Sequence, residues 1–74
     1  MAITTKEEYK TKLNEFIDLG HSPFDETVVR QMFDEVQEGN LSDGVVLEAL
    51  KELFDSPFIT QRMLDDLRQK YNLN

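Results

Sequence analysis

Apolar residues recur at the spacing of an α-helix in four separate segments of the chain. Within each segment they repeat with a period near 3.6 residues, which places them in one stripe along a helix. One face of each predicted helix must therefore be buried. The apolar positions are Tyr9, Leu13, Phe16 and Ile17, then Val28, Val29, Met32, Phe33 and Val36, then Val45, Val46, Ala49, Leu50, Leu53 and Phe54, and finally Met63, Leu64, Leu67 and Tyr71.

Residues that can cap a helix stand directly before each apolar stripe. Residues 4–8 contain two overlapping S/T-x-x-E capping boxes, so the first helix begins at Thr4 or Thr5. The other helices are preceded by an Asp, Ser or Thr, and by an apolar residue that can pack on the fourth helical residue. These caps are Asp25, Ser42 and Thr60, and the apolar residues before them are Phe24, Leu41 and Ile59. Ser22 with Pro23 is a competing start for the second helix.

Glycine and proline residues mark where the helices end. Gly20 fits the left-handed position after the first helix, and Gly39 closes the second. Ser56-Pro57 ends the third helix, because a residue before proline is displaced from the α region. The pattern predicts helices over about 5–19, from Asp25 to Gly39, over about 43–55, and from Thr60 to about 71.

These elements predict an all-α fold, a compact bundle of four short helices joined by tight turns. Residues 1–74 then form a single acidic helical domain. A domain this small removes only about 60% of its unfolded surface from water, so we expect modest stability. The predicted core is Tyr9, Leu13, Phe16, Ile17, Val29, Met32, Phe33, Val36, Val46, Leu50, Leu53, Leu64 and Leu67.

Acidic residues outnumber basic ones. The sequence holds 15 Asp and Glu against 8 Lys and Arg, a formal net charge of −7. The segment from Asp25 to Asp55 alone carries nine acidic residues against Arg30 and Lys51. Because Lys and Arg supply most non-specific affinity for nucleic acid, this balance argues against direct nucleic-acid binding, including binding by a helix-turn-helix formed from the last two helices.

The cysteine content and the hydropathy of the chain indicate the cellular compartment in which the protein works. The chain has no cysteine, and no apolar run approaches the roughly 20 residues that span a bilayer. The first residues show no apolar run after a basic start. We therefore expect a soluble, cytoplasmic protein that does not enter a membrane.

Two features suggest metal binding or catalysis, and neither holds in detail. The turn around Gly39 has the general form of a calcium-binding EF-hand loop. With Asp34 in its first position, however, Val36 and Val45 occupy the third and twelfth positions, where oxygen ligands are required. His21 lies between two aspartates, but a loop histidine near a helix C-terminus is more often a surface or capping residue. We predict no enzyme activity, no metal ion and no cofactor.

Two function classes remain after these exclusions. The first is a non-catalytic protein–protein interaction module, of adaptor or inhibitor type, that uses apolar residues near the C-terminus or the acidic helical hairpin. The same apolar residues could instead complete a homodimer. The second class is an acidic nucleic-acid mimic, of the phage-inhibitor type, that blocks a basic groove.

Each function class predicts its own binding residues. The apolar candidates are Phe58, Met63, Tyr71 and Leu73. The acidic candidates, which mimicry requires on one continuous surface, are Glu26, Asp34, Glu35, Glu38, Glu48, Glu52 and Asp55. Glu48 and Glu52 are like charges at i, i+4, a locally unfavourable pair that lends mild support to a functional acidic face.

Overall fold

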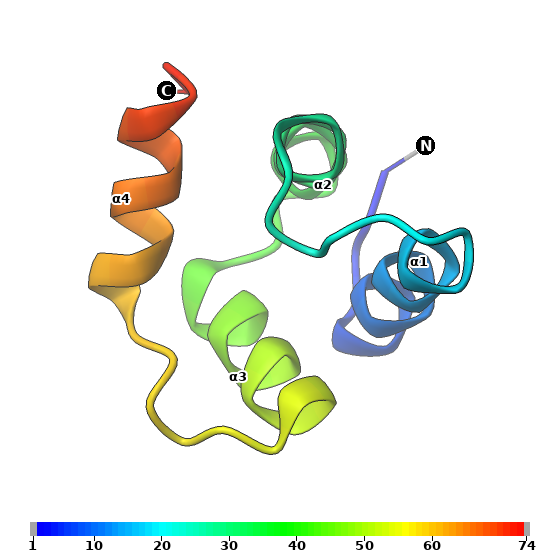
Figure 1. Ribbon diagram of the computed structural model, residues 1–74. Coiled ribbons are helices and arrows are strands. Elements are labelled where there is room, and N and C mark those ends of the chain that lie inside the picture. The colour runs from blue at the N-terminus through cyan, green and yellow to red at the C-terminus, as the bar shows by residue number, and fades with distance from the viewer. Residues whose placement is uncertain (1, 74) are drawn as a thin grey trace.

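The computed structural model describes residues 2–73 and contains four α-helices (Figure 1). They are α1 (Lys6–Asp18), α2 (Glu26–Glu38), α3 (Asp43–Phe54) and α4 (Gln61–Lys70). No strand forms within residues 2–73, and the helices gather into a globule of 28 × 25 × 25 Å. The all-α fold class is therefore confirmed. Within the same residues, no helix has the length and apolar character needed to cross a membrane.

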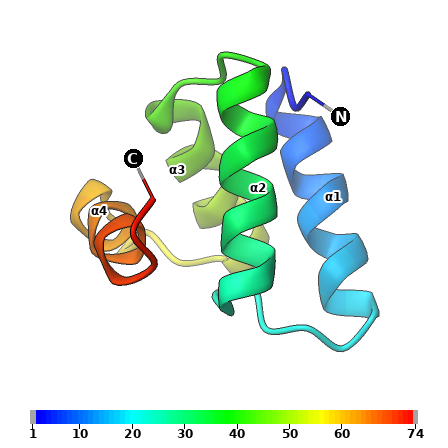
Figure 2. The same ribbon diagram turned by 90° about the horizontal axis from the view of Figure 1, so that it is seen from above.

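The first three helices pack around a shared centre, and the fourth lies to one side. Helices α1 and α2 lie side by side and run in opposite directions (Figure 2). Helix α3 packs against α1, and α4 packs against α3 (Figure 1). Helix α4 is thus the outermost helix, bordering the others along one flank.

All four predicted helix starts are confirmed. In each case a side-chain oxygen of the cap accepts a hydrogen bond from the backbone N–H three residues later, one of the four N–H groups that a helix start leaves unpaired. The caps are Thr5, Asp25, Ser42 and Thr60, and the donors are Glu8, Val28, Val45 and Met63. The competing start at Ser22 is not used, and its hydroxyl instead accepts from the Phe24 amide at 3.3 Å.

Gly20 ends α1 in the predicted way. It adopts a left-handed conformation with φ +92°. Its N–H donates to the Ile17 carbonyl at 2.9 Å, and the His21 N–H donates to the Phe16 carbonyl at 3.0 Å. This pair of bonds defines the Schellman motif and satisfies two of the carbonyls left at the helix end.

Gly39 is needed because of close packing, not because of its φ angle. The turn after α2 has its left-handed residue at Asn40 (φ +56°), whereas Gly39 keeps φ −86°. The segment before α1 passes directly over Gly39, so a Cβ atom there would overlap the backbone carbonyl of Ile3. The Ile3 N–H also donates to the Glu35 carbonyl at 2.9 Å. The N-terminal segment is thereby fastened to the end of α2.

The buried core agrees with the prediction at many positions and differs at some. The predicted residues that are buried are Tyr9, Leu13, Met32, Val36, Val46, Leu50 and Leu64. Those that are half-buried are Phe16, Ile17, Val29, Phe33, Leu53 and Leu67. The buried residues that the prediction missed are Ile3, Val28, Ala49 and Ile59.

Helix α2 explains one of these corrections. Val28 and Val29 are adjacent, so periodicity alone allows either to face inward. The structure buries Val28 completely and leaves Val29 half-buried. The buried face of α2 runs through Val28, Met32 and Val36, at i, i+4 and i+8, and it also includes Glu35.

Candidate functional site

The predicted acidic residues on α3 form ion pairs with lysines of α1. Lys6 Nζ lies 3.1 Å from Glu48 Oε1 and 2.7 Å from Glu52 Oε2, and Lys10 Nζ lies 3.1 Å from Glu52 Oε1. Hydrogen bonds to Glu52 and Glu48 raise the pKa of Lys6 to about 12, and the bond from Lys6 lowers the pKa of Glu52. The like charges on α3 therefore have a structural explanation, and their support for a functional acidic face is lost.

Glu35 is buried, so the prediction that places it on an exposed acidic surface is wrong. Only 6% of the residue is exposed, because it lies on the inner face of α2. Its carboxylate accepts a hydrogen bond from Gln31 Nε2 at 3.1 Å and lies 3.9 Å from Lys12 Nζ. The continuous surface that mimicry requires is interrupted at this residue.

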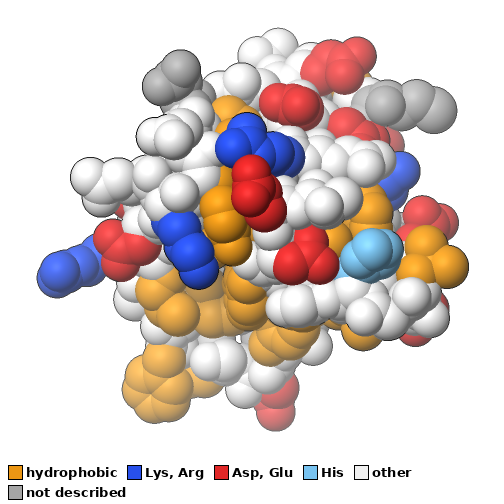
Figure 3. Space-filling model, turned by 45° about the horizontal axis from the view of Figure 1, so that its top comes forward, with side chains coloured by type: hydrophobic (Ala, Val, Ile, Leu, Met, Phe, Trp, Pro, Cys, Tyr) orange, Lys and Arg blue, Asp and Glu red, His pale blue; other side chains and the backbone are white. Residues whose placement is uncertain are grey.

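The other predicted acidic residues lie on the surface. Glu26 Oε2 pairs with Arg30 Nε at 2.7 Å on α2. Asp34 and Glu38 are exposed on the same helix, and Asp55 is exposed at the end of α3. The face shown in Figure 3 mixes acidic side chains with Lys and Arg, while hydrophobic side chains gather towards the lower left.

The predicted apolar residues fall into two groups. Phe58 is 81% exposed and Met63 is 47% exposed, and they flank the start of α4. Tyr71 and Leu73 are half-buried. The Tyr71 hydroxyl donates to the Phe24 carbonyl at 3.0 Å, which ties the end of α4 to the loop before α2. The structure therefore leaves Phe58 and Met63 as the accessible members of the set.

Two further exposed hydrophobic residues were not predicted, namely Leu19 at 76% and Phe24 at 40%. Leu19 is the last residue before the Gly20 turn, so solvent surrounds it. The Phe24 ring lies 5.9 Å from the Phe54 ring, centroid to centroid. The helical pattern did not reveal them because both lie outside the helices.

Polar contacts at its edges hold α4 in place. Arg68 forms a two-pronged ion pair with Asp43, with Nη2–Oδ1 at 2.6 Å and Nη1–Oδ2 at 3.0 Å, and its Nη1 also lies 3.2 Å from Asp65. The hydrogen bond from Arg68 is the main reason that the pKa of Asp43 is lowered. Directly after the same end of the helix, Arg30 Nη2 donates to the Tyr71 carbonyl at 2.7 Å. Leu64 is the buried residue of α4.

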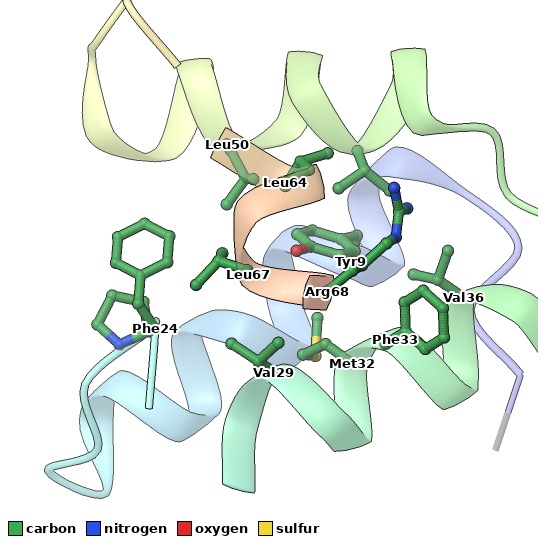
Figure 4. Close-up of a pocket in the computed structure, with 12 residues that line it drawn as sticks. Tyr9, Phe24, Val29, Met32, Phe33, Val36, Leu50, Leu64, Leu67 and Arg68 are labelled. Atoms are coloured by element: carbon green, nitrogen blue, oxygen red, sulfur yellow. The ribbon is translucent and has the colours of Figure 1, made fainter. Parts of the chain in front are cut away.

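An apolar cavity lies beneath α4, with a volume of about 60 Å³. All four helices and the loop before α2 contribute to its wall (Figure 4). The lining consists of Tyr9, Pro23, Phe24, Val29, Met32, Phe33, Val36, Val46, Leu50, Leu64, Leu67 and Arg68. Several predicted core residues therefore line this cavity, among them the half-buried Val29, Phe33 and Leu67.

Tyr9 brings a polar group to this cavity. The residue is 7% exposed, and no hydrogen bond joins its hydroxyl to any residue from 2 to 73. The hydroxyl oxygen itself is accessible to a water-sized molecule, since no fully buried side-chain oxygen within these residues lacks a partner. Burial alone raises the pKa of Tyr9 to about 12, so the hydroxyl stays neutral. The sequence pattern identified Tyr9 as an apolar core residue and gave its hydroxyl no role.

The structure also locates the residues considered for metal binding and catalysis. His21 Nδ1 lies 3.5 Å from Asp25 Oδ2, and its ring packs edge-on against Phe16 at 5.9 Å. This is the surface position expected for a loop histidine. Helix α3 begins at Asp43, inside the span of about 12 residues that a calcium loop starting at Asp34 would need. Within residues 2–73, no cluster of three or more His, Asp or Glu could hold a metal ion.

Searches of family models, curated proteins and solved structures found no match. Function must therefore be inferred from the surfaces and the cavity of this chain.

Proposed function

We propose that this protein is a non-catalytic protein–protein interaction module, an adaptor or inhibitor, that binds a partner through Phe58 and Met63. The observation that carries this proposal is the 81% exposure of Phe58, together with the 47% exposure of Met63 in the first turn of α4. Phenylalanine and methionine are enriched where protein interfaces are fully buried. Covering these two side chains with an apolar pocket of a partner removes them from water and stabilises the complex.

The partner that fits best is a basic protein. The net charge of −7 attracts a positively charged surface over long range and raises the association rate, mainly at low salt. The lack of cysteine fits a protein that works in the reducing cytoplasm.

Mimicry of nucleic acid has weaker support. The buried position of Glu35 removes one of the required charges. Ion pairs with Lys6 and Lys10 occupy Glu48 and Glu52. Apolar docking needs none of these carboxylates.

Affinity capture with the full chain as bait tests the proposal. Phe58→Ala should weaken partner binding tenfold or more, equivalent to about 1.4 kcal/mol. Leu19→Ala is the matched control, because Leu19 is also highly exposed but lies at the end of α1. Capture should be unchanged for this control.

A charge-reversal variant separates the two function classes. Asp34, Glu38 and Asp55 are suitable positions because they are exposed and form no ion pair within residues 2–73, unlike Glu48 and Glu52. Apolar docking predicts that their triple Lys variant keeps most of its affinity at physiological salt. Binding that is lost on charge reversal and unchanged in Phe58→Ala would contradict the proposal and favour mimicry.

Sedimentation of the purified chain tests the homodimer alternative. If Phe58 and Met63 served a twofold interface, the apparent mass should rise with concentration, and Phe58→Ala should abolish the rise. A mass that stays monomeric at all concentrations leaves the apolar residues available for a different protein.

A further inference from the structure

The cavity beneath α4 combines an apolar wall with the hydroxyl of Tyr9. Its volume of about 60 Å³ is several times the roughly 10–15 Å³ that a water molecule needs. A water molecule in a protein interior also needs two to four polar partners. The lining offers few, because most of its side chains are hydrocarbon and Arg68 is already engaged by Asp43 and Asp65.

The Tyr9 hydroxyl is the polar group left for a ligand. Its ring lies in the middle of the lining, and its oxygen faces the side of the cavity where Leu50 and Leu67 lie (Figure 4). The residue is 7% exposed, and no residue from 2 to 73 pairs with the hydroxyl. Within residues 2–73, no fully buried side-chain nitrogen or oxygen lacks a hydrogen-bond partner, so the hydroxyl is open to the cavity. A ligand in the cavity that hydrogen-bonds to it gains about the affinity of one hydrogen bond.

We propose that this cavity is a binding site for a small neutral amphiphile, with an aromatic or short aliphatic body and one hydroxyl or carbonyl group. The body contacts the leucine, valine and methionine side chains of the wall, and the polar group hydrogen-bonds to Tyr9. An anionic ligand is disfavoured. Asp43 and Asp65 already surround Arg68 at the rim, and the whole protein is negatively charged.

A ligand with a ring requires α4 to move outward, because α4 is the outermost wall of the cavity. A ring such as benzene occupies a cavity of about 150 Å³ in other proteins, so a ring here needs extra room. Leu64 is the buried residue of α4, while Leu67 and Arg68 are half-buried, so this side of the cavity opens to solvent. A small outward shift of α4 would widen the cavity by stretching the Arg68–Asp43 and Arg30–Tyr71 contacts, while α1 keeps its contacts with α2 and α3.

Titration of the ¹⁵N-labelled full chain with phenol, toluene and benzoate tests this site by NMR. Phenol and toluene have the same shape and differ in the hydroxyl that would reach Tyr9. Phenol should cause saturable shifts at the amides of Leu64, Leu67 and Val29, and benzoate should cause none. Linear shifts spread over the whole surface would show non-specific association and overturn the proposal.

Tyr9→Phe isolates the hydrogen bond because it keeps the ring. The ratio of phenol to toluene affinity should fall about fivefold in this variant, the value expected for one hydrogen bond. The ratio of phenol to toluene affinity is compared between the parent and Tyr9→Phe, so the different hydration free energies of phenol and toluene cancel. An unchanged ratio would overturn the role of Tyr9. The variant should fold at least as stably as the parent, since it loses only a hydroxyl without a protein partner.

Leu67→Phe tests the location by filling the cavity from α4. Ligand binding should weaken tenfold or more. Leu53→Phe is the matched control, since Leu53 is a half-buried helical leucine that does not line the cavity. Equal binding by both variants would place the ligand elsewhere. These variants leave Phe58 unchanged, so failure here is distinguishable from failure of the protein-binding proposal.

Discussion

Replacing Gly39 by alanine should destabilise this protein, although the backbone conformation of Gly39 is one that alanine adopts without strain. Gly39 has φ −86°, which any residue adopts easily. The obstacle is tertiary, because the added Cβ atom would overlap the backbone carbonyl of Ile3. That carbonyl belongs to backbone, so a side-chain rotation cannot relieve the overlap. The N-terminal segment has to move away from α2.

The cost comes from two contacts that the N-terminal segment loses when it moves. Moving the segment exposes Ile3, which is 3% exposed in the native fold, and this costs about 1.5–3 kcal/mol. It also breaks the bond from the Ile3 N–H to the Glu35 carbonyl, worth about 0.5–1.5 kcal/mol. The lower backbone entropy of unfolded alanine offsets about 0.4–1 kcal/mol. The free energy of unfolding should therefore fall by about 1–4 kcal/mol, and the middle of each range gives about 2.5 kcal/mol.

Thermal and urea unfolding measure this effect, with Gly44→Ala as the matched control. A loss of about 2.5 kcal/mol should lower the melting temperature by roughly 10–20 °C in a domain of this size. At Gly44, in the first turn of α3, the nearest atom to an added Cβ is Ser42 Oγ at 4.0 Å. Alanine should be tolerated there and stabilise the helix by up to about 0.5 kcal/mol.

A double variant identifies the cause. When Ile3→Ala has already weakened the docking of the segment, Gly39→Ala should cost much less than it does alone. Equal and favourable shifts for Gly39→Ala and Gly44→Ala would refute the reasoning. So would strictly additive effects of the Ile3 and Gly39 changes, because the overlap would then not involve the N-terminal segment.

Two further predictions concern the contact between α2, α3 and α4. Phe33→Ala should lower the free energy of unfolding by about 2 kcal/mol, which is less than the loss expected for a fully buried phenylalanine. The reason is that Phe33 is half-buried, with the Arg68 guanidinium stacked 5.2 Å from its ring centre. Urea denaturation measures the effect, and a loss above about 4 kcal/mol would contradict the prediction. Arg68→Gln should flatten the acid side of the stability profile. Because Arg68 lowers the pKa of Asp43 below its usual range, the folded state gains stability above the unfolded pKa near 4 and loses it as pH falls through the folded pKa. Melting temperatures of the parent and of Arg68→Gln, measured from pH 5 down to about pH 2, should therefore differ at pH 5 and converge at low pH. If the two curves of melting temperature against pH stayed parallel, the coupling between Arg68 and Asp43 would be disproved.

Local sequence determined the helices of this protein. The caps at Thr5, Asp25, Ser42 and Thr60, and the turn at Gly20, depend on hydrogen bonds between residues within one or two turns of each other. Such contacts are present in the sequence as short motifs, which is why the helix boundaries agreed with prediction to within a few residues.

Tertiary structure decided which residues face one another. Val28 is buried instead of Val29, and the charged Glu35 is buried as well. Both follow from the orientation of α2 about its own axis and from the N-terminal segment that crosses it. The requirement for glycine at position 39 arises from Ile3, 36 positions earlier in the chain. The cavity beneath α4 exists because side chains from all four helices enclose space that they do not fill. Periodicity specifies the apolar face of one helix, but burial, close approach and cavities depend on pairs of distant residues, and no single segment encodes those distances.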